Sequence, residues 1–240
     1  MARELDQSNL VKDELEDKFI FSFIHDLKNM MVPIMSRAEM LQLPGINEER
    51  RKDMVQQIVQ NCGAMLDVMN KMVGICKNRN SLEAYTPKTL NLFNLVSEAF
   101  DVVSEAAERK EITLSLSVAE DLAVYADREA VLGVIVNLLG NAVKFTPRGG
   151  NVEVLAGKIG TDVTVSVSDS GVGLDELKIA NLLENNKYFH TPGTEGELGS
   201  GLGLLLCDSH LRRGGSKLKF ANNPNGGATF SFVLPTSLQA

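Results

Sequence analysis

Two stretches near the start of the chain carry apolar residues at alternating steps of three and four. The first consists of Ile20, Ile24, Leu27, Met31, Ile34, Ala38 and Leu41. The second consists of Val55, Ile58, Cys62, Met65, Met69, Met72 and Cys76. This spacing is a heptad seam, typical of helices that pack side by side. Between them Leu43-Pro44-Gly45 breaks the pattern and Asn47 can cap the second helix, so the sequence predicts an antiparallel helical hairpin.

The two seams need more apolar surface than a single hairpin offers. Two hairpins paired into a four-helix bundle bury such seams well. The pattern therefore favours a homodimer. It leaves open the alternative that the seams pack against the rest of the same chain.

The spacing of apolar residues changes after the polar stretch at 77–88. The rest of the chain alternates between segments with helical periodicity and segments with strand periodicity. Helices are expected at 95–109, 127–144 and about 203–213, and strands at 112–118, 152–155, 163–167, 217–221 and 228–234. A glycine-rich, weakly patterned stretch covers about 171–203. The fold class is thus multi-domain, α followed by α+β. We expect a dimerisation hairpin at 1–80, a linker at 81–90 and an α/β sandwich domain at 91–240.

Composition narrows the possible partners. The net charge of −7 over 240 residues argues against nucleic-acid binding, which needs a basic surface. No run approaches the roughly 20 apolar residues that span a bilayer, so no membrane contact is expected. The first ten residues lack the apolar core of a signal peptide, so we expect a cytoplasmic chain.

One expected helix carries a polar face. Asn137, Asn141 and Lys144 stand at i, i+4 and i+7, which places them on the same side. Amide oxygens are hard ligands that suit Mg²⁺, and a lysine supplies a point charge for phosphate. The face therefore suits a Mg²⁺–phosphate group. The alternative is an ordinary solvated face of an amphipathic helix.

Two glycine-rich motifs follow. The run Asp169-Ser170-Gly171-Val172-Gly173 comes just after an alternating strand, where a carboxylate can accept a hydrogen bond from an amine such as that of adenine. An ordinary turn is the alternative. The run Gly199-Ser200-Gly201-Leu202-Gly203 opens a helix and offers free N–H groups to phosphate. It matches neither the P-loop nor the dinucleotide-binding fingerprint.

Taken in order, these motifs resemble the ATPase domain shared by histidine kinases, the gyrase B subunit, the Hsp90 chaperone and the MutL repair protein. They look most like the N, G1 and G2 boxes of histidine kinases. The resemblance implies a helix–sheet sandwich that binds ATP and Mg²⁺. It implies Asn141 as the Mg²⁺ ligand, with Asn137 and Lys144 at the phosphates and Asp169 at the adenine amine. The residues implied to line the nucleotide are Gly171, Gly173, Gly199, Ser200, Gly201, Leu202 and Gly203.

The first seam carries a candidate nucleophile. His25 follows a seam residue and should flank the seam, where its imidazole can attack a phosphoryl group. Asp26 beside it could fix the tautomer and take the proton. The run from Phe23 to Asn29 resembles the H box of histidine kinases, except that Met30 stands where a proline usually follows. The resemblance implies autophosphorylation of His25 and phosphotransfer to an aspartate on a response-regulator receiver domain. It also implies that Asn29 orients water for phosphatase activity.

Two other functions remain open from the sequence. The chain could be an ATPase of the same family that uses lid closure to drive a conformational change. It could also be a phosphotransfer scaffold without kinase activity. Acid-labile phosphate on His25 would separate the kinase from the first, and ATP binding would separate it from the second.

Overall fold

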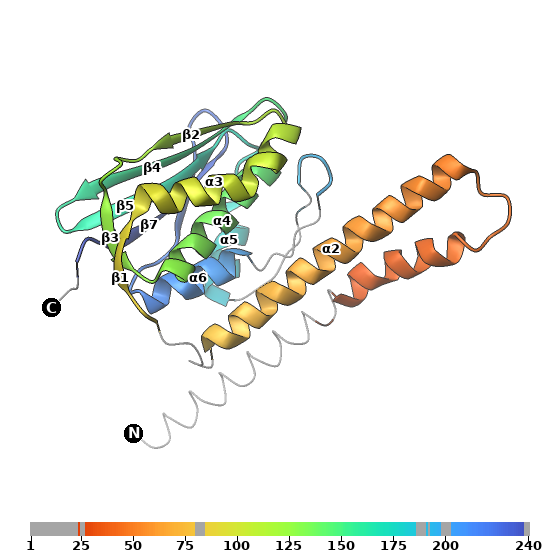
Figure 1. Cartoon of the computed structure of the whole chain (residues 1–240), viewed down its shortest axis with the longest axis horizontal. Coiled ribbons are helices and arrows are strands. Elements are labelled where there is room, and N and C mark those ends of the chain that lie inside the picture. Colours follow the sequence, from red (N-terminus) through yellow and green to blue (C-terminus); the bar gives the residue numbers. More distant parts are fainter. Residues whose placement is uncertain are drawn as a thin grey trace, which may run out of the picture. The chain divides into compact units, whose positions relative to one another are not determined.

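The computed structural model describes residues 24, 27–79, 85–185, 191, 193–197 and 203–237 (Figure 1). Within it the chain forms two compact units, Met1–Asn70 and Lys71–Ala240. No helix in the described ranges is long and apolar enough to cross a membrane. The helical and α/β parts expected from the sequence are both present, so the predicted fold class is confirmed.

The first unit is formed by a helical hairpin, whose second helix continues beyond Asn70. Residues 27–40 are helical, a turn follows, and the second helix, α2, begins at Glu48 and runs to Arg79. Asn47 caps α2 as predicted, because its Oδ1 accepts a hydrogen bond from the Arg50 N–H at 2.8 Å. Glu48 and Glu49 occupy the first turn, where negative charges stabilise the helix by interacting with the positive end of its dipole. Arg37 of the first arm donates to Gln57 Oε1 at 2.6 Å, which ties the arms together.

The apolar residues of α2 divide into two stripes, which differ from the predicted seam. Met54 is buried and lines a groove with residues of the first arm, and Ile58 and Met65 are half-buried. A second stripe is exposed and consists of Val55, Val59, Cys62, Leu66, Met69 and Val73. Its members again follow steps of four and three. The predicted seam mixed the two stripes because one antiparallel arm can cover only one side of a helix.

The second unit is built on a five-stranded sheet with strand order β2-β4-β5-β7-β6. The strands are β2 (Thr113–Ser117), β4 (Asn151–Ile159), β5 (Asp162–Asp169), β6 (Lys219–Asn222) and β7 (Ala228–Pro235). Among the described strands of this sheet, β2 and β4 pair in parallel and the other neighbours are antiparallel. β4 and β5 meet in a tight turn at Gly160-Thr161, as predicted, with Gly160 at φ 63°.

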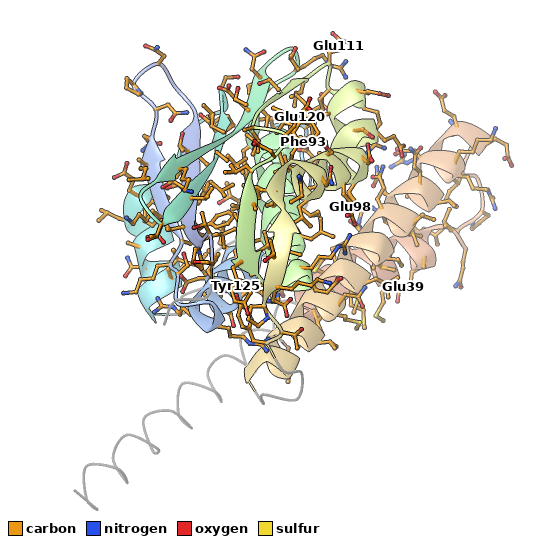
Figure 2. All side chains as sticks on the ribbon, turned by 60° about the vertical axis from the view of Figure 1, so that its left-hand side comes forward. Glu39, Phe93, Glu98, Glu111, Glu120 and Tyr125 are labelled. Carbon is orange, nitrogen blue, oxygen red and sulfur yellow. The ribbon has the colours of Figure 1, made fainter. Side chains whose placement is uncertain are left out.

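Three helices cover one face of this sheet: α3 (Leu92–Arg109), α4 (Arg128–Phe145) and α6 (Gly203–Arg213) (Figure 1). Alternate residues of β4, β5 and β7 point to this face, so the buried residues fall at every second position, as valines in β4 and β5 and mainly as larger apolar residues in β7. α4 lies at the centre and is buried along Val134, Ile135, Leu138 and Leu139. Side chains from both layers fill the space between them (Figure 2).

Three of the described elements were not predicted from the sequence. β1 (Lys88–Asn91) and β3 (Ala123–Ala126) pair antiparallel in a small separate sheet. Four residues are too few to show a period, and β1 begins inside the segment expected to be a linker. α5 (Glu176–Asn185) lies in the stretch expected to be irregular. Asp175 caps it by accepting from the Lys178 N–H at 3.1 Å, and Ile179 and Leu182 anchor it in the core.

A candidate nucleotide-binding site at the end of helix α4

The site begins with α4, which positions the predicted polar face. Asp127 caps the helix by accepting from the Ala130 N–H at 3.0 Å. The apolar residues of α4 are buried against the sheet. Asn137, Asn141 and Lys144 therefore lie at the half-buried margin of this helix. Asn137 Nδ2 donates back to the Gly133 carbonyl at 3.0 Å, and this fixes the orientation of the carboxamide.

Gly203, the first residue of α6, lies against this polar face. A Cβ atom built on Gly203 would stand 3.1 Å from Asn137 Oδ1 and 3.8 Å from Asn141 Nδ2. The absence of a side chain at Gly203 is therefore what lets the start of α6 approach both carboxamides. The structure thus brings together the predicted helix face and the last glycine of the third motif.

Asp169 is the last residue of β5 and is buried. Its Oδ1 accepts two backbone hydrogen bonds, from Gly171 at 2.8 Å and from Ala228 at 3.1 Å. Within the described part of the chain, its Oδ2 accepts none. Burial raises the pKa of Asp169, although the two backbone N–H groups oppose the shift. A buried carboxylate with a spare oxygen is suited to an amine donor on a flat ring.

The loop after Asp169 crosses the C-terminal end of α4. Val172 N–H donates to the Phe145 carbonyl at 3.2 Å. A Cβ atom on Gly171 would fall 2.4 Å from the same carbonyl oxygen, so a side chain there would force the loop away. Gly173 adopts φ 78°, a conformation that favours glycine. The second motif therefore meets the first at the end of α4, as a shared nucleotide site requires.

Three residues that support Asp169 or the loop that follows it were not found from the sequence. Asn223 Nδ2 donates to the Asp169 carbonyl at 2.9 Å. Asn222 Oδ1 accepts from the Leu174 N–H at 2.7 Å while its Nδ2 donates to the Leu174 carbonyl at 3.1 Å. Gly227, at φ 84°, passes so close that a Cβ atom would meet the Asp169 carbonyl oxygen. The sequence marks this segment only as a turn between two strands, so nothing in it points to Asp169.

Lys144 lies beside a segment that precedes α6. Its Nζ donates to the Thr191 carbonyl at 3.0 Å and stands 4.6 Å from the centre of the Phe145 ring. The predicted phosphate-binding lysine is thus held next to residues 191 and 193–197. Lys110, which the sequence did not single out, donates hydrogen bonds to Thr194 and Glu197 of the same segment.

Several predicted site residues lie outside the described residues. These are His25, Asp26, Gly199, Ser200, Gly201 and Leu202. Asn29 is described, and it is exposed on the first arm of the hairpin.

The described residues fit a magnesium nucleotide. The spare oxygen of Asp169 suits the adenine amine, and Asn137 and Asn141 lie against the start of α6. Lys144, on the same helix, lies beside Thr191 and Gly193. Among the described residues, no group of three or more His, Cys, Asp or Glu side chains could hold a metal ion. Mg²⁺ bound through nucleotide phosphates needs only one or two protein ligands, and the Asn141 carboxamide can supply one.

Sequence comparison gives relatives over nearly the whole chain. Residues 126–238 match the family described as Histidine kinase-, DNA gyrase B-, and HSP90-like ATPase. The adaptive-response sensory kinase SasA of Rippkaea orientalis is 32% identical over 219 residues, which are 88% of this chain and 56% of SasA. Sensor protein KdpD of Clostridium acetobutylicum is 28% identical over 99% of this chain and 27% of KdpD. The chain thus spans roughly half or less of these relatives.

Solved structures of histidine kinases are also similar to this chain. The catalytic domain of histidine kinase ThkA is 30% identical with a TM-score of 0.53, covering 63% of this chain and 96% of that domain. ThkA in complex with the response regulator TrrA gives a TM-score of 0.72 at 23% identity over 89% of this chain, a likeness of fold alone. The second unit is therefore an ATP-binding domain of the histidine kinase, gyrase B and HSP90 class. More narrowly, the chain belongs to the sensor histidine kinases and contains their catalytic core.

Proposed function

We propose that this chain is a protein-histidine kinase of a two-component system, which phosphorylates its own His25 from ATP. The observation that carries the proposal is the meeting of the three motifs at α4. Gly203 lies against Asn137 and Asn141, and the loop after Asp169 bonds to the end of the same helix. The placement of His25 on the first arm rests on the sequence.

Each side chain has one task in this proposal. Asp169 accepts the adenine amine, and Asn137 and Lys144 hold the phosphates. Asn141 supplies the protein ligand for Mg²⁺, which neutralises phosphate charge in such reactions. A ring nitrogen of His25 attacks the γ-phosphorus, the bond to the bridging oxygen breaks, and ADP leaves. Asp26 takes the imidazole proton.

The test is incubation of the chain with γ-labelled ATP and Mg²⁺. We expect one label per chain, labile in acid and stable in base, as befits a phosphoramidate. His25→Gln should bind ATP as the parent does and take up no label. Label that is absent from the parent, or that persists in His25→Gln, would contradict the proposal. ATP turnover without a labelled intermediate would favour a conformational ATPase.

The hairpin is proposed to form a four-helix bundle with a second copy, with residues 1–80 as the dimerisation unit. The exposed stripe on α2 supports this. Val59 is 64% exposed, Leu66 60% and Val73 52%, and such continuous apolar surface favours a partner. Residues 81–90 are then the link to the ATP-binding domain at 91–240. The proposed location is the cytoplasm.

The proposed partner is the receiver domain of a response regulator, whose aspartate takes the phosphoryl group from His25. ThkA has been solved with a response regulator, and the shared fold makes the same kind of partner reasonable here. Asn29 is proposed to orient water in the reverse reaction, because a carboxamide positions water without titrating. Asn29→Ala should keep His25 labelling yet dephosphorylate the regulator more slowly. Equal rates in the variant and the parent would remove this role.

A further inference from the structure

Residues 193–197 form a compact turn that is bonded to the end of α4. The Gly193 N–H donates to the Glu197 carbonyl at 2.9 Å, and the Gly196 N–H donates back to the Gly193 carbonyl at 3.0 Å. The Thr194 N–H donates to the Lys144 carbonyl at 3.1 Å. Thr194 Oγ1 also lies 3.0 Å from the Thr146 carbonyl. The turn therefore uses backbone acceptors that the last residues of α4 leave free.

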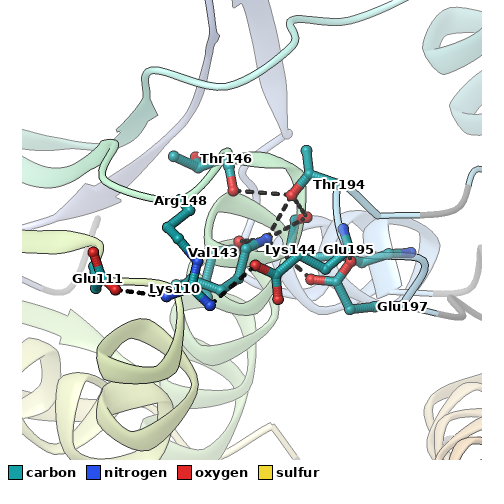
Figure 3. Close-up of polar contacts among 9 residues, drawn as sticks. All are labelled: Lys110, Glu111, Val143, Lys144, Thr146, Arg148, Thr194, Glu195 and Glu197. Atoms are coloured by element: carbon teal, nitrogen blue, oxygen red, sulfur yellow. Dashed lines mark hydrogen bonds and ion pairs between the residues drawn. The ribbon is translucent and has the colours of Figure 1, made fainter.

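A buried lysine from another element fastens this turn. Lys110, at the end of α3, has a side chain only 5% exposed. Its Nζ lies 2.8 Å from the Val143 carbonyl, 3.0 Å from the Lys144 carbonyl, 2.6 Å from Thr194 Oγ1 and 3.0 Å from Glu197 Oε1 (Figure 3). Three N–H donors thus serve four oxygens that belong to α4 and to the turn.

Glu197, whose side chain is 34% exposed, balances the charge of the buried Lys110 ammonium group. Burial would raise the pKa of its carboxyl group, but hydrogen bonds from the backbone and from Lys110 lower the pKa overall. Its second oxygen accepts from the Glu195 N–H at 2.8 Å. The carboxylate therefore both closes the turn and pairs with the lysine.

The turn fits closely against Lys144. A Cβ atom on Gly193 would stand 2.7 Å from Lys144 Cγ and would also meet Glu197. Lys144 Nζ donates to the Thr191 carbonyl at 3.0 Å. The Lys144 side chain thus packs along a surface whose position depends on the fastened turn.

We propose that Lys110 is a positioning residue for the nucleotide site, because its buried ammonium group fixes the turn at 193–197 and with it the side chain of Lys144. This inference rests on the proposed ATP-binding function. Lys110 touches no reacting atom. Its contribution is to hold Lys144 in place before ATP arrives, so that binding does not bear the cost of ordering the turn.

The same turn offers a matched control. Glu195 pairs with Arg148 at 3.5 Å, and both side chains are about half exposed (44% and 53%). An exposed ion pair contributes little because water screens it. Glu195→Gln therefore changes a charge of the same kind, in the same turn, without touching the buried contact.

The experiment compares Lys110→Met, Glu197→Gln, the double variant Lys110→Met/Glu197→Met and Glu195→Gln in the full chain. Calorimetric titration gives the Kd for ATP, initial labelling rates give KM and kcat, and thermal scans give stability. Lys110→Met should raise Kd and KM about tenfold and change kcat less than about twofold. Glu197→Gln should shift them in the same direction, and Glu195→Gln should match the parent. Hydrogen exchange at the amides of residues 193–197 should speed up with Lys110→Met.

The double variant separates positioning from stability. It leaves no unpaired charge at this partly buried contact, so it should regain part of the thermal stability that Lys110→Met loses. Its Kd for ATP should stay raised because the turn has no anchor. A double variant that regains both stability and affinity would overturn the proposal, as would a folded Lys110→Met with the parent's Kd. If the parent itself neither binds ATP nor labels, the proposed function fails first. Should Lys110→Met not fold, Glu197→Gln and the double variant decide the matter.

Discussion

The start of α6 meets the middle of α4 where Gly203 lies against the carboxamide of Asn137. A Cβ atom on Gly203 would come 3.1 Å from Asn137 Oδ1, closer than most such contacts. The two residues belong to motifs that stand far apart in the chain. Their contact fixes where the glycine-rich helix start meets the polar face of α4.

Gly203→Ala should weaken ATP binding because the added methyl group must displace the Asn137 or Asn141 carboxamide. We expect the Kd for ATP to rise about tenfold, measured by calorimetric titration. Gly140→Ala is the control, since a Cβ atom on Gly140 in the same helix α4 would meet nothing within 4 Å. It should keep the parent's Kd and raise the free energy of unfolding by about 0.5–1 kcal/mol. Equal affinities in the two variants would contradict the close contact.

Asp169→Asn should abolish ATP binding without harming the fold. The asparagine Oδ1 can keep both backbone hydrogen bonds, but its Nδ2 would present a donor to the adenine amine.

Burial raises the pKa of Asp169 in the folded chain, so this carboxyl contributes stability below its ordinary pKa of 3.8 and loses that contribution as the pH rises through the folded value. The variant should therefore match or exceed the parent's Tm at pH 7, and this advantage should shrink towards pH 4. Thermal scans between pH 4 and pH 7 give the difference in Tm between the variant and the parent. A difference that does not change with pH would contradict the raised pKa of Asp169.

Glu111→Gly should stabilise the second unit. Glu111 follows the C-cap of α3 at φ 54°, where a Schellman motif forms. Its N–H donates to the Glu108 carbonyl, and the Ile112 N–H donates to the Ala107 carbonyl. This conformation costs a residue with a side chain about 1–2 kcal/mol. Glu111→Ala is the control, because both variants lose the exposed pair with Arg148. In urea denaturation the glycine variant should exceed the alanine variant by about 1 kcal/mol. Equal unfolding midpoints would show that the strain is relieved elsewhere.

Val59→Glu combined with Leu66→Glu should separate the proposed dimer into monomers. Both residues lie on the exposed stripe of α2, and each buried apolar side chain contributes about 1.5–3 kcal/mol. Gln60→Glu adds a single charge of the same sign at an exposed position off the stripe and should leave the dimer intact. Sedimentation velocity gives the masses. A parent chain that is monomeric at micromolar concentration would refute the bundle.

The elements with a repeated pattern were predictable, and the short ones were not. The alternating valines of β4 and β5 and the turn at Gly160 appear in the structure as expected. β1 and β3 have four residues each and exist because they pair with one another, not because of a pattern in either. The seam on α2 was predicted as one stripe, yet the hairpin divides it in two. A heptad spacing gives the period of an apolar face but not which neighbour covers it.

The sequence by itself determined the chemistry of the site, because Asn137, Asn141, Lys144, Asp169 and the glycines already have the residue types that a magnesium nucleotide needs. Only the tertiary structure decided what holds them. Asn223 reaches Asp169 from β6–β7, and Lys110 reaches the turn at 193–197 from the end of α3. These contacts join residues whose separation along the chain carries no period. They depend on how the sheet and helices pack, and a linear pattern does not contain that information.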